Sequence, residues 1–336
     1  MDAIKSNDTD PAPPPRLRSL WSWIQGKAST KGRRTKKAFR KVNCAPTAMT
    51  RAGARATQRT CYDRSILVKI RDAYNRTHPD QSPIQTRQPA ALVQALRDRL
   101  SDQCDQEDCW LKLLPSAQMQ YLEERIFAPK HPREWLKNPR EWLSNYDIIN
   151  VLRQYEAAYP DFTFLGPSPI DFDKRLPGKR GCVENAICTF RLANYVGPDA
   201  KQTHIKKIGL SFNLDEHDEA GSHWVTLYVD LNHGIVFYFD SALNDTPPEI
   251  DALVHRILDQ ARELGLKMTY RKNRVQHQFS NSECGMYSLF FLVTLITGKW
   301  DQRPMSVMTA LRRFETKRVP DAVVSRFRNE YFNDPV

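Results

Sequence analysis

A lone cysteine, Cys284, stands where a polar loop turns into a long apolar segment, in "QHQFSNSECGMYSLFFLV" (residues 276–293). The apolar run predicts a buried helix over residues 285–297, with Cys284 at its start. The dipole and free N–H groups of a helix N-terminus stabilise negative charge, which favours a thiolate nucleophile there. Gly285 would let a substrate backbone approach closely. On these two residues alone, plain packing of a buried Cys-Gly pair remains an alternative.

A base for this cysteine is expected at His223, which follows the acidic loop "DEHDEAGS" and begins the strand-like run "HWVTLYVD". A strand fixes an imidazole better than a loop does. Residues 222–230 and 234–240 predict an antiparallel hairpin with its turn near Asn232. Asp240 then pairs near Trp224 and reaches His223, where a carboxylate would orient the imidazole. Trp224 would wall the site against water, although a strand-edge histidine beside a core tryptophan is the alternative.

An oxyanion donor would complete this set, and two glutamines of the loop are candidates. Gln278 lies six residues before Cys284, and Gln276 lies eight before it. A side-chain N–H of either, together with the Cys284 backbone N–H, would hold the charge that develops on a carbonyl oxygen under attack. The chemistry expected of the four groups is nucleophilic cleavage of an acyl bond.

The order His223, Asp240, Gln278, Cys284 resembles the Ulp/SENP-type cysteine proteases, which cleave ubiquitin-like modifiers or viral polyproteins. The "HW" pair, the Asp-Ser that closes the next strand, the 17-residue interval from His223 to Asp240 and the "Q-x5-CG" spacing all carry this resemblance. Residues 140–156, "REWLSNYDIINVLRQYE", resemble the helix that opens the family's catalytic domain. The resemblance covers roughly residues 135–300.

This resemblance implies an α+β fold with a papain-like core, in which helices flank a mixed β-sheet. It favours Gln278 over Gln276 as the oxyanion donor. It also implies that Trp224 lines a narrow tunnel, and that cleavage follows Gly-Gly or another Gly-x sequence. Glu283 departs from the family, whose cellular members usually carry Asp before the cysteine, and we expect little consequence from that change.

Upstream features are similar to the Ulp-like proteases of large DNA viruses. They are a basic tail, a small helical unit that ends in "C-x4-CWL", and "LGPSPIDF" before the hairpin. Relatives of this kind mature core or capsid precursors. The resemblance therefore implies an endopeptidase that processes a structural polyprotein during virion maturation.

Other functions are compatible with the same residues. A deSUMOylase or deubiquitinase would act on host conjugates of ubiquitin-like modifiers. An acetyltransferase can use the same triad order, but "Q-x5-CG" favours a peptidase. A nucleic-acid-binding or scaffold protein with a vestigial protease core is the alternative from another class, and the intact His, Asp, Gln and Cys set argues against it.

The excess positive charge of the chain is located in one segment. Residues 1–60 contain fourteen Lys and Arg against three Asp and Glu, which accounts for the whole net charge of +11. We expect this segment to be a disordered basic tail, with a short amphipathic helix at residues 16–27. Its basic stretch from Lys31 to Lys41 would contact nucleic acid, direct nuclear import or touch an anionic membrane, or would simply be solvated.

Two folded parts are predicted after the tail. Residues 61–115 predict a small helical domain, with amphipathic helices at "SILVKIRDAYN" and "PAALVQALRDRL". Residues 116–336 predict the protease domain. Its predicted helices lie at residues 145–158, 182–193, 248–264, 285–297, 304–314 and 320–331. Its predicted strands lie at residues 204–212, 222–230, 234–240 and 266–274.

Composition excludes several classes of protein. No run approaches the roughly 18 apolar residues of a membrane span, and Met1 is followed by acidic and proline-rich residues, so we expect no signal peptide. Seven cysteines do not form a dense disulfide framework, which favours an intracellular, reducing setting. The five-residue step from Cys104 to Cys109 favours packing or a redox-sensitive pair over zinc. We expect no metal and no cofactor.

Overall fold

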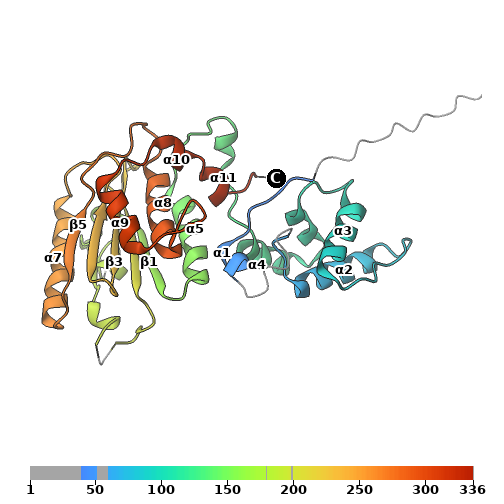
Figure 1. The fold of residues 1–336 in the computed structure, drawn as a ribbon, viewed down its shortest axis with the longest axis horizontal. Helices are drawn as coiled ribbons and strands as arrows, with labels where there is room; N and C mark the ends of the chain where they lie inside the picture. Colours follow the sequence, from blue (N-terminus) through green and yellow to red (C-terminus); the bar gives the residue numbers. More distant parts are fainter. Residues whose placement is uncertain (1–38, 51–59, 179, 198–199, 336) are drawn as a thin grey trace, which may run out of the picture. The chain divides into compact units, whose positions relative to one another are not determined.

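The structure, a computed structural model, describes residues 39–50, 60–178, 180–197 and 200–335 (Figure 1). Residues Ala38–Val336 form one compact unit. Most of the predicted basic tail, including residues 16–27 and most of the stretch from Lys31 to Lys41, lies outside the described residues.

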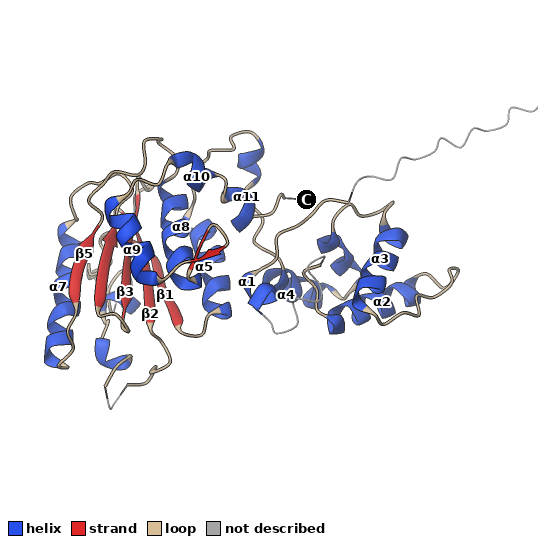
Figure 2. Cartoon of the chain, viewed as in Figure 1, coloured by secondary structure: helices blue, strands red, loops and turns tan. Residues whose placement is uncertain are grey.

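A mixed five-stranded sheet has the strand order β1-β2-β3-β4-β5 (Figures 1 and 2). β1 pairs with β2 and β4 with β5 in parallel, whereas the β2–β3 and β3–β4 pairs are antiparallel. The antiparallel β3–β4 pair is the predicted hairpin, and the mixed sheet with flanking helices confirms the predicted α+β fold class. The strands are β1 (Phe162–Pro169), β2 (Lys207–Asn213), β3 (Trp224–Asp230), β4 (Ile235–Phe239) and β5 (Thr269–Lys272).

Side chains of the hairpin alternate between two apolar clusters, as expected for the two faces of a sheet. On β3, Trp224 and Tyr228 join one cluster, while Leu227 joins the other. On β4, Phe237 joins the first cluster and Val236 the second. Every residue of both strands is buried. Burial on both faces explains the nearly continuous apolar runs from which these strands are predicted.

The helix α8 (Cys284–Thr297) packs within the first cluster, and its residues from Cys284 to Ile296 are all buried. Gly209 of β2 lets the helix approach the sheet, since a Cβ added there would lie 3.1 Å from Leu292 Cδ2. A helix that is apolar all round is a core helix. The first cluster also contains residues of α5 (Asn145–Ala158), α9 (Val307–Thr316), α10 (Asp321–Ser325) and α11 (Arg328–Tyr331).

The helix α7 (Pro248–Glu263) contributes to the second cluster. Ile250, Leu253, Val254, Ile257 and Ala261 are its buried residues, at the i, i+3, i+4, i+7, i+11 spacing of one helical face. The two apolar clusters thus explain why helices flank the sheet on both faces, and why both faces of the hairpin are buried.

A third apolar cluster lies in the N-terminal helical part. Its elements are α1 (Pro46–Thr50), α2 (Arg64–Thr77), α3 (Pro89–Leu100), the 3-10 helix η2 (Glu107–Leu113) and α4 (Ser116–Ile126). The cluster runs from Val42 to Phe127, so α4 continues it past residue 115. Asn43 connects the N-terminal helical part to the C-terminal segment through hydrogen bonds. Its backbone N–H donates to Asn333 Oδ1, and its side chain donates to the Asn329 carbonyl.

Several segments differ from the sequence prediction, among them α4, which was not predicted. β1 was not predicted, because Gly166 and Pro167 interrupt its apolar pattern and its register shifts between Leu165 and Ser168. The helix predicted at residues 182–193 is reduced to α6 (Asn185–Cys188) and the 3-10 helix η4 (Leu192–Asn194). The helix predicted at residues 320–331 is divided into α10 and α11. The remaining short elements are η3 (Arg133–Leu136), β6 (Lys299–Trp300) and β7 (Arg303–Pro304).

Candidate active site

Cys284 is the first residue of α8 and is only 3% exposed. It is the free cysteine among the described residues. The other six cysteines are paired as Cys44–Cys61, Cys104–Cys109 and Cys182–Cys188. No dense disulfide framework was expected from the sequence, which did not predict these three pairs between cysteines 5 to 17 residues apart. The helix N-terminus offers its dipole to a thiolate at Cys284.

His223 and Asp240 meet at the open end of the hairpin. His223 Nε2 lies 2.6 Å from Asp240 Oδ1, and the Asp240 side chain is 1% exposed. Thr226 pairs with Phe239, so Asp240 continues opposite Val225, one residue from the register expected from the sequence. The backbone N–H groups of Ala242 and Asn244 also donate to the Asp240 carboxylate.

The protonation of His223 reflects its two neighbours. Burial opposes a charged imidazole, but hydrogen bonds to Asp240 and Cys284, and the negative charges of both, raise the pKa of His223 to about 9. Nε2 faces Asp240, which leaves Nδ1 for Cys284. Burial would raise the pKa of Asp240, but the hydrogen bond and charge of His223 and the two backbone donors hold it below its ordinary value. The arrangement favours an imidazolium between two anions.

Gln278 is buried, whereas Gln276 is exposed. Gln278 Oε1 accepts a hydrogen bond from Ser241 Oγ at 2.7 Å, and its Nε2 donates to the Ser280 carbonyl at 2.6 Å. One N–H of Gln278 Nε2 is left over after these contacts. The fixed, buried amide is the better candidate for an oxyanion donor, since Gln276 donates its side chain to the Gln278 carbonyl instead.

Trp224 and Gly285 pack together beside Cys284. The Trp224 ring is 6% exposed, and its Nε1 donates to the Leu143 carbonyl at 2.9 Å. A Cβ added to Gly285 would lie 2.8 Å from Leu143 Cβ and 3.3 Å from Trp224 Cδ1. Packing therefore accounts for the glycine, and the substrate-binding roles of both residues stay predictions. The neighbouring Trp142 is 44% exposed.

Sequence reasoning missed the residues that hold these groups in place. The Asn273 side chain accepts from the Asp240 backbone N–H at 3.0 Å and donates to the Asp240 carbonyl at 2.7 Å. The Arg328 guanidinium pairs with Glu283 at 3.1 Å, and both residues are buried. In the sequence, Ser241 stood out only as part of the Asp-Ser pair and had no assigned role. Polar residues such as Asn273 and Arg328 carry no pattern that marks them in a single sequence.

His277 is buried in the loop that precedes Cys284 and has a structural role. Its Nε2 lies 2.8 Å from the Phe314 carbonyl, and its Nδ1 accepts the Val319 backbone N–H at 3.0 Å. Burial, aided by the charge of Arg318, lowers the pKa of His277 to about 4 despite the hydrogen bond to Phe314. The ring is neutral at physiological pH and anchors the loop that leads to Cys284.

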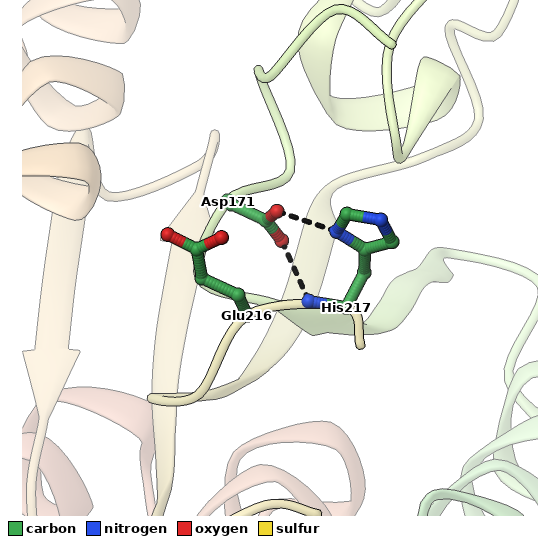
Figure 3. A group of neighbouring side chains, drawn as sticks. All are labelled: Asp171, Glu216 and His217. Atoms are coloured by element: carbon green, nitrogen blue, oxygen red, sulfur yellow. Dashed lines mark hydrogen bonds and ion pairs between the residues drawn. The ribbon is translucent and has the colours of Figure 1, made fainter. Parts of the chain in front are cut away.

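Another group of polar side chains, Asp171, Glu216 and His217, lies outside this site (Figure 3). His217 donates its backbone N–H to Asp171, and His217 Nδ1 lies 2.6 Å from Asp171 Oδ2. The Lys174 ammonium pairs with both acids. Because Lys174 and His217 are the partners of these carboxylates, the group is an ion-pair network and carries no argument for a metal ion.

No helix in the described part of the chain is long and apolar enough to cross a membrane.

Part of the chain matches a known protein family. Residues 194–334 match the Ulp1 protease family, C-terminal catalytic domain. Thiol protease R355 of Acanthamoeba polyphaga mimivirus is 30% identical over 176 residues, which cover 52% of this chain and 52% of that protein. The chain therefore spans about half the length of that relative. A SUMO-1 cysteine protease of African swine fever virus is 27% identical over 215 residues, which cover 63% of this chain and 73% of the viral protein.

The fold is shared with a solved viral structure. The crystal structure of a protease of African swine fever virus superimposes with a TM-score of 0.57 at 19% identity, over 87% of this chain and 96% of that one. The match includes most of the described chain and confirms the Ulp1-like fold implied by the resemblance. Residues 194–334 thus match a catalytic domain of the Ulp1 type, and the chain shares the fold of a viral protease.

Proposed function

We propose that the chain is a cysteine endopeptidase in which Cys284 is the nucleophile, His223 the base and acid, Asp240 the orienting carboxylate and Gln278 an oxyanion donor. The observation that carries the proposal is His223 held between Asp240 and the free Cys284 at the start of α8. A thiolate–imidazolium pair at a helix N-terminus is the form in which a cysteine attacks a carbonyl.

The first half of the reaction forms an acyl-enzyme. The Cys284 sulfur attacks the carbonyl carbon of the scissile peptide bond, and the carbonyl oxygen becomes an oxyanion. The remaining Nε2–H of Gln278 and the Cys284 backbone N–H stabilise that charge. When the C–N bond breaks, His223 gives its proton to the leaving amine.

The second half releases the product. His223, now neutral, takes a proton from a water molecule, and the hydroxide attacks the thioester carbonyl. The C–S bond breaks, the new C-terminal carboxylate leaves, and the thiolate is restored next to the imidazolium. Asp240 keeps the His223 ring oriented in both halves, since its oxygens are held by His223, Ala242 and Asn244.

The proposed substrate is a protein precursor cut after Gly-Gly or another Gly-x sequence. Trp224 is packed against Gly285, and the exposed Trp142 lies next to the Leu143 carbonyl that holds the Trp224 indole. The family resemblance implies that Trp224 lines a narrow tunnel, which would admit only residues without large side chains. The viral relatives extend the proposal to a virus that matures its core or capsid proteins.

Cleavage profiling tests the proposal. Candidate structural precursors and a library of Gly-Gly-x peptides are incubated with the wild-type chain and with Cys284→Ala, and the new termini are identified by mass spectrometry. We expect new C-terminal glycines with the wild type only. Cleavage that persists in Cys284→Ala at the wild-type rate, with the fold intact, would refute the proposal.

A second candidate function is an isopeptidase that acts on conjugates of ubiquitin-like modifiers. The name of the African swine fever virus relative, a SUMO-1 cysteine protease, favours it. A SUMO or ubiquitin probe with a reactive C-terminus distinguishes the two functions. Rapid labelling of Cys284 by the probe supports the isopeptidase, whereas preference for linear precursor peptides supports the processing enzyme.

A third candidate, nucleic-acid binding or a scaffold function, depends on the basic stretch from Lys31 to Lys41. Deletion of residues 1–60 tests it: binding to DNA that survives the deletion would assign that role to the folded part of the chain. If the stretch is responsible, the deletion should abolish DNA binding and leave peptide cleavage unchanged.

The proposed location is inside the infected cell, in the virion or in the host cytoplasm or nucleus. In a reducing cytoplasm or nucleus the six paired cysteines would be free thiols, whereas an oxidising setting would keep them as disulfides. Counting free thiols in the chain isolated from virions and from infected cytoplasm distinguishes the two settings.

A further inference from the structure

Hydrogen bonds connect the turn after β4 to the loop that carries Gln278. Asn273 makes two hydrogen bonds with the Asp240 backbone. The Ser241 carbonyl accepts the backbone N–H groups of His277 and Gln278, at 2.9 and 2.8 Å. Asp240 contacts His223, and the next residue, Ser241, contacts Gln278. Two neighbouring residues thus contact the proposed base and the proposed oxyanion donor.

The contacts of Gln278 decide how its amide is oriented. The Ser280 carbonyl can only accept a hydrogen bond, so the NH₂ end of the Gln278 amide must face it. The oxygen end then faces Ser241 Oγ at 2.7 Å, and the Ser241 hydroxyl must be the donor. Ser241 is 1% exposed and Gln278 is 7% exposed, so bulk water does not compete with this hydrogen bond.

We propose that Ser241 is a positioning residue for the oxyanion donor: its hydroxyl fixes the Gln278 amide so that the spare Nε2–H is held toward the reacting carbonyl. This inference rests on the proposed function. Buried hydrogen bonds in a dry site are strong and directional, and an oxyanion donor is effective only when it is held in place before the reaction. Ser241 touches neither substrate nor Cys284 in this role and acts through Gln278.

Removal of the hydroxyl should weaken catalysis more than binding. In Ser241→Ala, the backbone contacts of residue 241 remain, but Gln278 Oε1 loses its donor and the amide can rotate. We expect kcat to fall roughly 10-fold and KM to change less than about two-fold, compared with the roughly 100-fold loss expected for Gln278→Ala. Gln278→Glu keeps an acceptor for Ser241 but has no N–H, so it should lose as much activity as Gln278→Ala.

A double-mutant cycle separates positioning through Gln278 from a general structural effect. In the Gln278→Ala background, Ser241→Ala should lower kcat by less than about two-fold. Ser211→Ala is the matched control, since Ser211 of β2 is as buried as Ser241 and donates only a long hydrogen bond to the Val225 carbonyl at 3.5 Å. The control should retain wild-type kcat.

Two readouts keep this inference separate from the proposed function. The rate of Cys284 alkylation by iodoacetamide reports the Cys284–His223 pair, and we expect it to be unchanged in Ser241→Ala. Hydrogen exchange of the Gln278 side-chain amide, followed by NMR, should be faster in Ser241→Ala, and this measurement requires no turnover.

The proposed function and the role of Ser241 fail on different results. A wild-type chain that cleaves no peptide refutes the proposed function, while faster amide exchange in Ser241→Ala still supports the role of Ser241 in holding Gln278. Unchanged kcat and unchanged exchange in Ser241→Ala overturn the inference. Equal losses with and without Gln278, or a parallel loss of Cys284 alkylation, overturn it as well, because Ser241 would then act through another group.

Discussion

At the residue scale, the pKa of His223 ties the geometry of the site to a measurable pH dependence. Contacts with Asp240 and Cys284 outweigh burial and raise that pKa to about 9. The imidazolium is therefore present at neutral pH and is lost as the pH rises through about 9. Since the leaving amine needs its proton, we expect kcat/KM to fall above that pH.

Asp240→Asn tests the cause of this alkaline limit. The amide keeps the shape of the carboxylate but removes its charge, so the pKa of His223 should decrease and the alkaline limit should move to lower pH. The measurement is a pH profile of kcat/KM for both chains. An alkaline limit at the same pH in both would contradict the assignment of Asp240 as the group that charges His223.

Gly285 provides a second prediction at this scale. An alanine Cβ would lie 2.8 Å from Leu143 Cβ, so either Leu143 or the start of α8 must shift. We expect Gly285→Ala to lower the free energy of unfolding by about 1–3 kcal/mol, the usual cost of overpacking, and to reduce activity because Cys284 moves with the helix. Denaturant melts compare it with Met286→Leu, a volume-conserving change at the next buried position. Equal stability of the two variants would contradict this packing.

The catalytic residue types could be predicted from the sequence because each stands at the boundary of a strong pattern. Cys284 precedes an apolar helix, and His223 and Asp240 bound the two runs of a hairpin. Ser241, Asn273 and Arg328 could not be assigned functions in advance, since their partners lie 37, 33 and 45 residues away in the sequence. Such long-range polar contacts follow only from the completed fold.

At the scale of elements, α11 is connected to the start of α8 by a buried ion pair. Arg328 is 4% exposed and donates to Glu283, to the Ser282 carbonyl and to the Glu141 carbonyl. Glu283 occupies the position immediately before Cys284. Where cellular members of the family usually carry Asp, this chain has a Glu that pairs with Arg328. This ion pair holds the loop before Cys284 against α11.

Removal of Arg328 should be costly. In Arg328→Ala the Glu283 carboxylate is left buried without its partner, and we expect a loss of about 3–5 kcal/mol in the free energy of unfolding. Arg326→Ala is the matched control, because Arg326 pairs with Asp301 at an exposed place and should contribute little. Chemical denaturation of both variants provides the measurement. Equal stabilities of the two would show that the Glu283 pair does not anchor the loop.

Regular elements could be predicted to different degrees. The helix over residues 145–158 and the hairpin match closely, because amphipathic spacing and alternation are local signals. β1 was missed, since its Gly166 and Pro167 are typical of a loop and its strand conformation depends on pairing with β2. The helix predicted at residues 320–331 is divided where Phe327 packs on Phe290, a tertiary contact that local propensity does not contain.

At the scale of the whole molecule, the Cys44–Cys61 disulfide closes the longest loop of the three, with a sequence separation of 17 residues. Asn43, next to Cys44, is bound to Asn329 and Asn333 near the C-terminus. The disulfide therefore fixes the segment that connects the helical part to the C-terminal segment.

The double variant Cys44→Ser/Cys61→Ser should be less stable by about 3 kcal/mol under oxidising conditions, the entropic contribution expected for a loop of this length. Denaturant titration with and without a reductant provides the measurement. The wild-type chain should lose stability on reduction by a larger amount than the double variant does. A double variant as stable as the oxidised wild type would show that this pair does not constrain the chain.

Covalent labelling provides the most direct measurement of the role of Cys284. A peptide that ends in Gly-Gly and carries a vinyl methyl ester is mixed with the wild-type chain, Cys284→Ala and His223→Ala, and the products are mapped by mass spectrometry. We predict one adduct per wild-type chain, on Cys284, none in Cys284→Ala, and labelling slower by at least about 100-fold in His223→Ala, which lacks the base. An adduct on another residue, or equal labelling rates in His223→Ala and the wild type, would contradict the proposed active site.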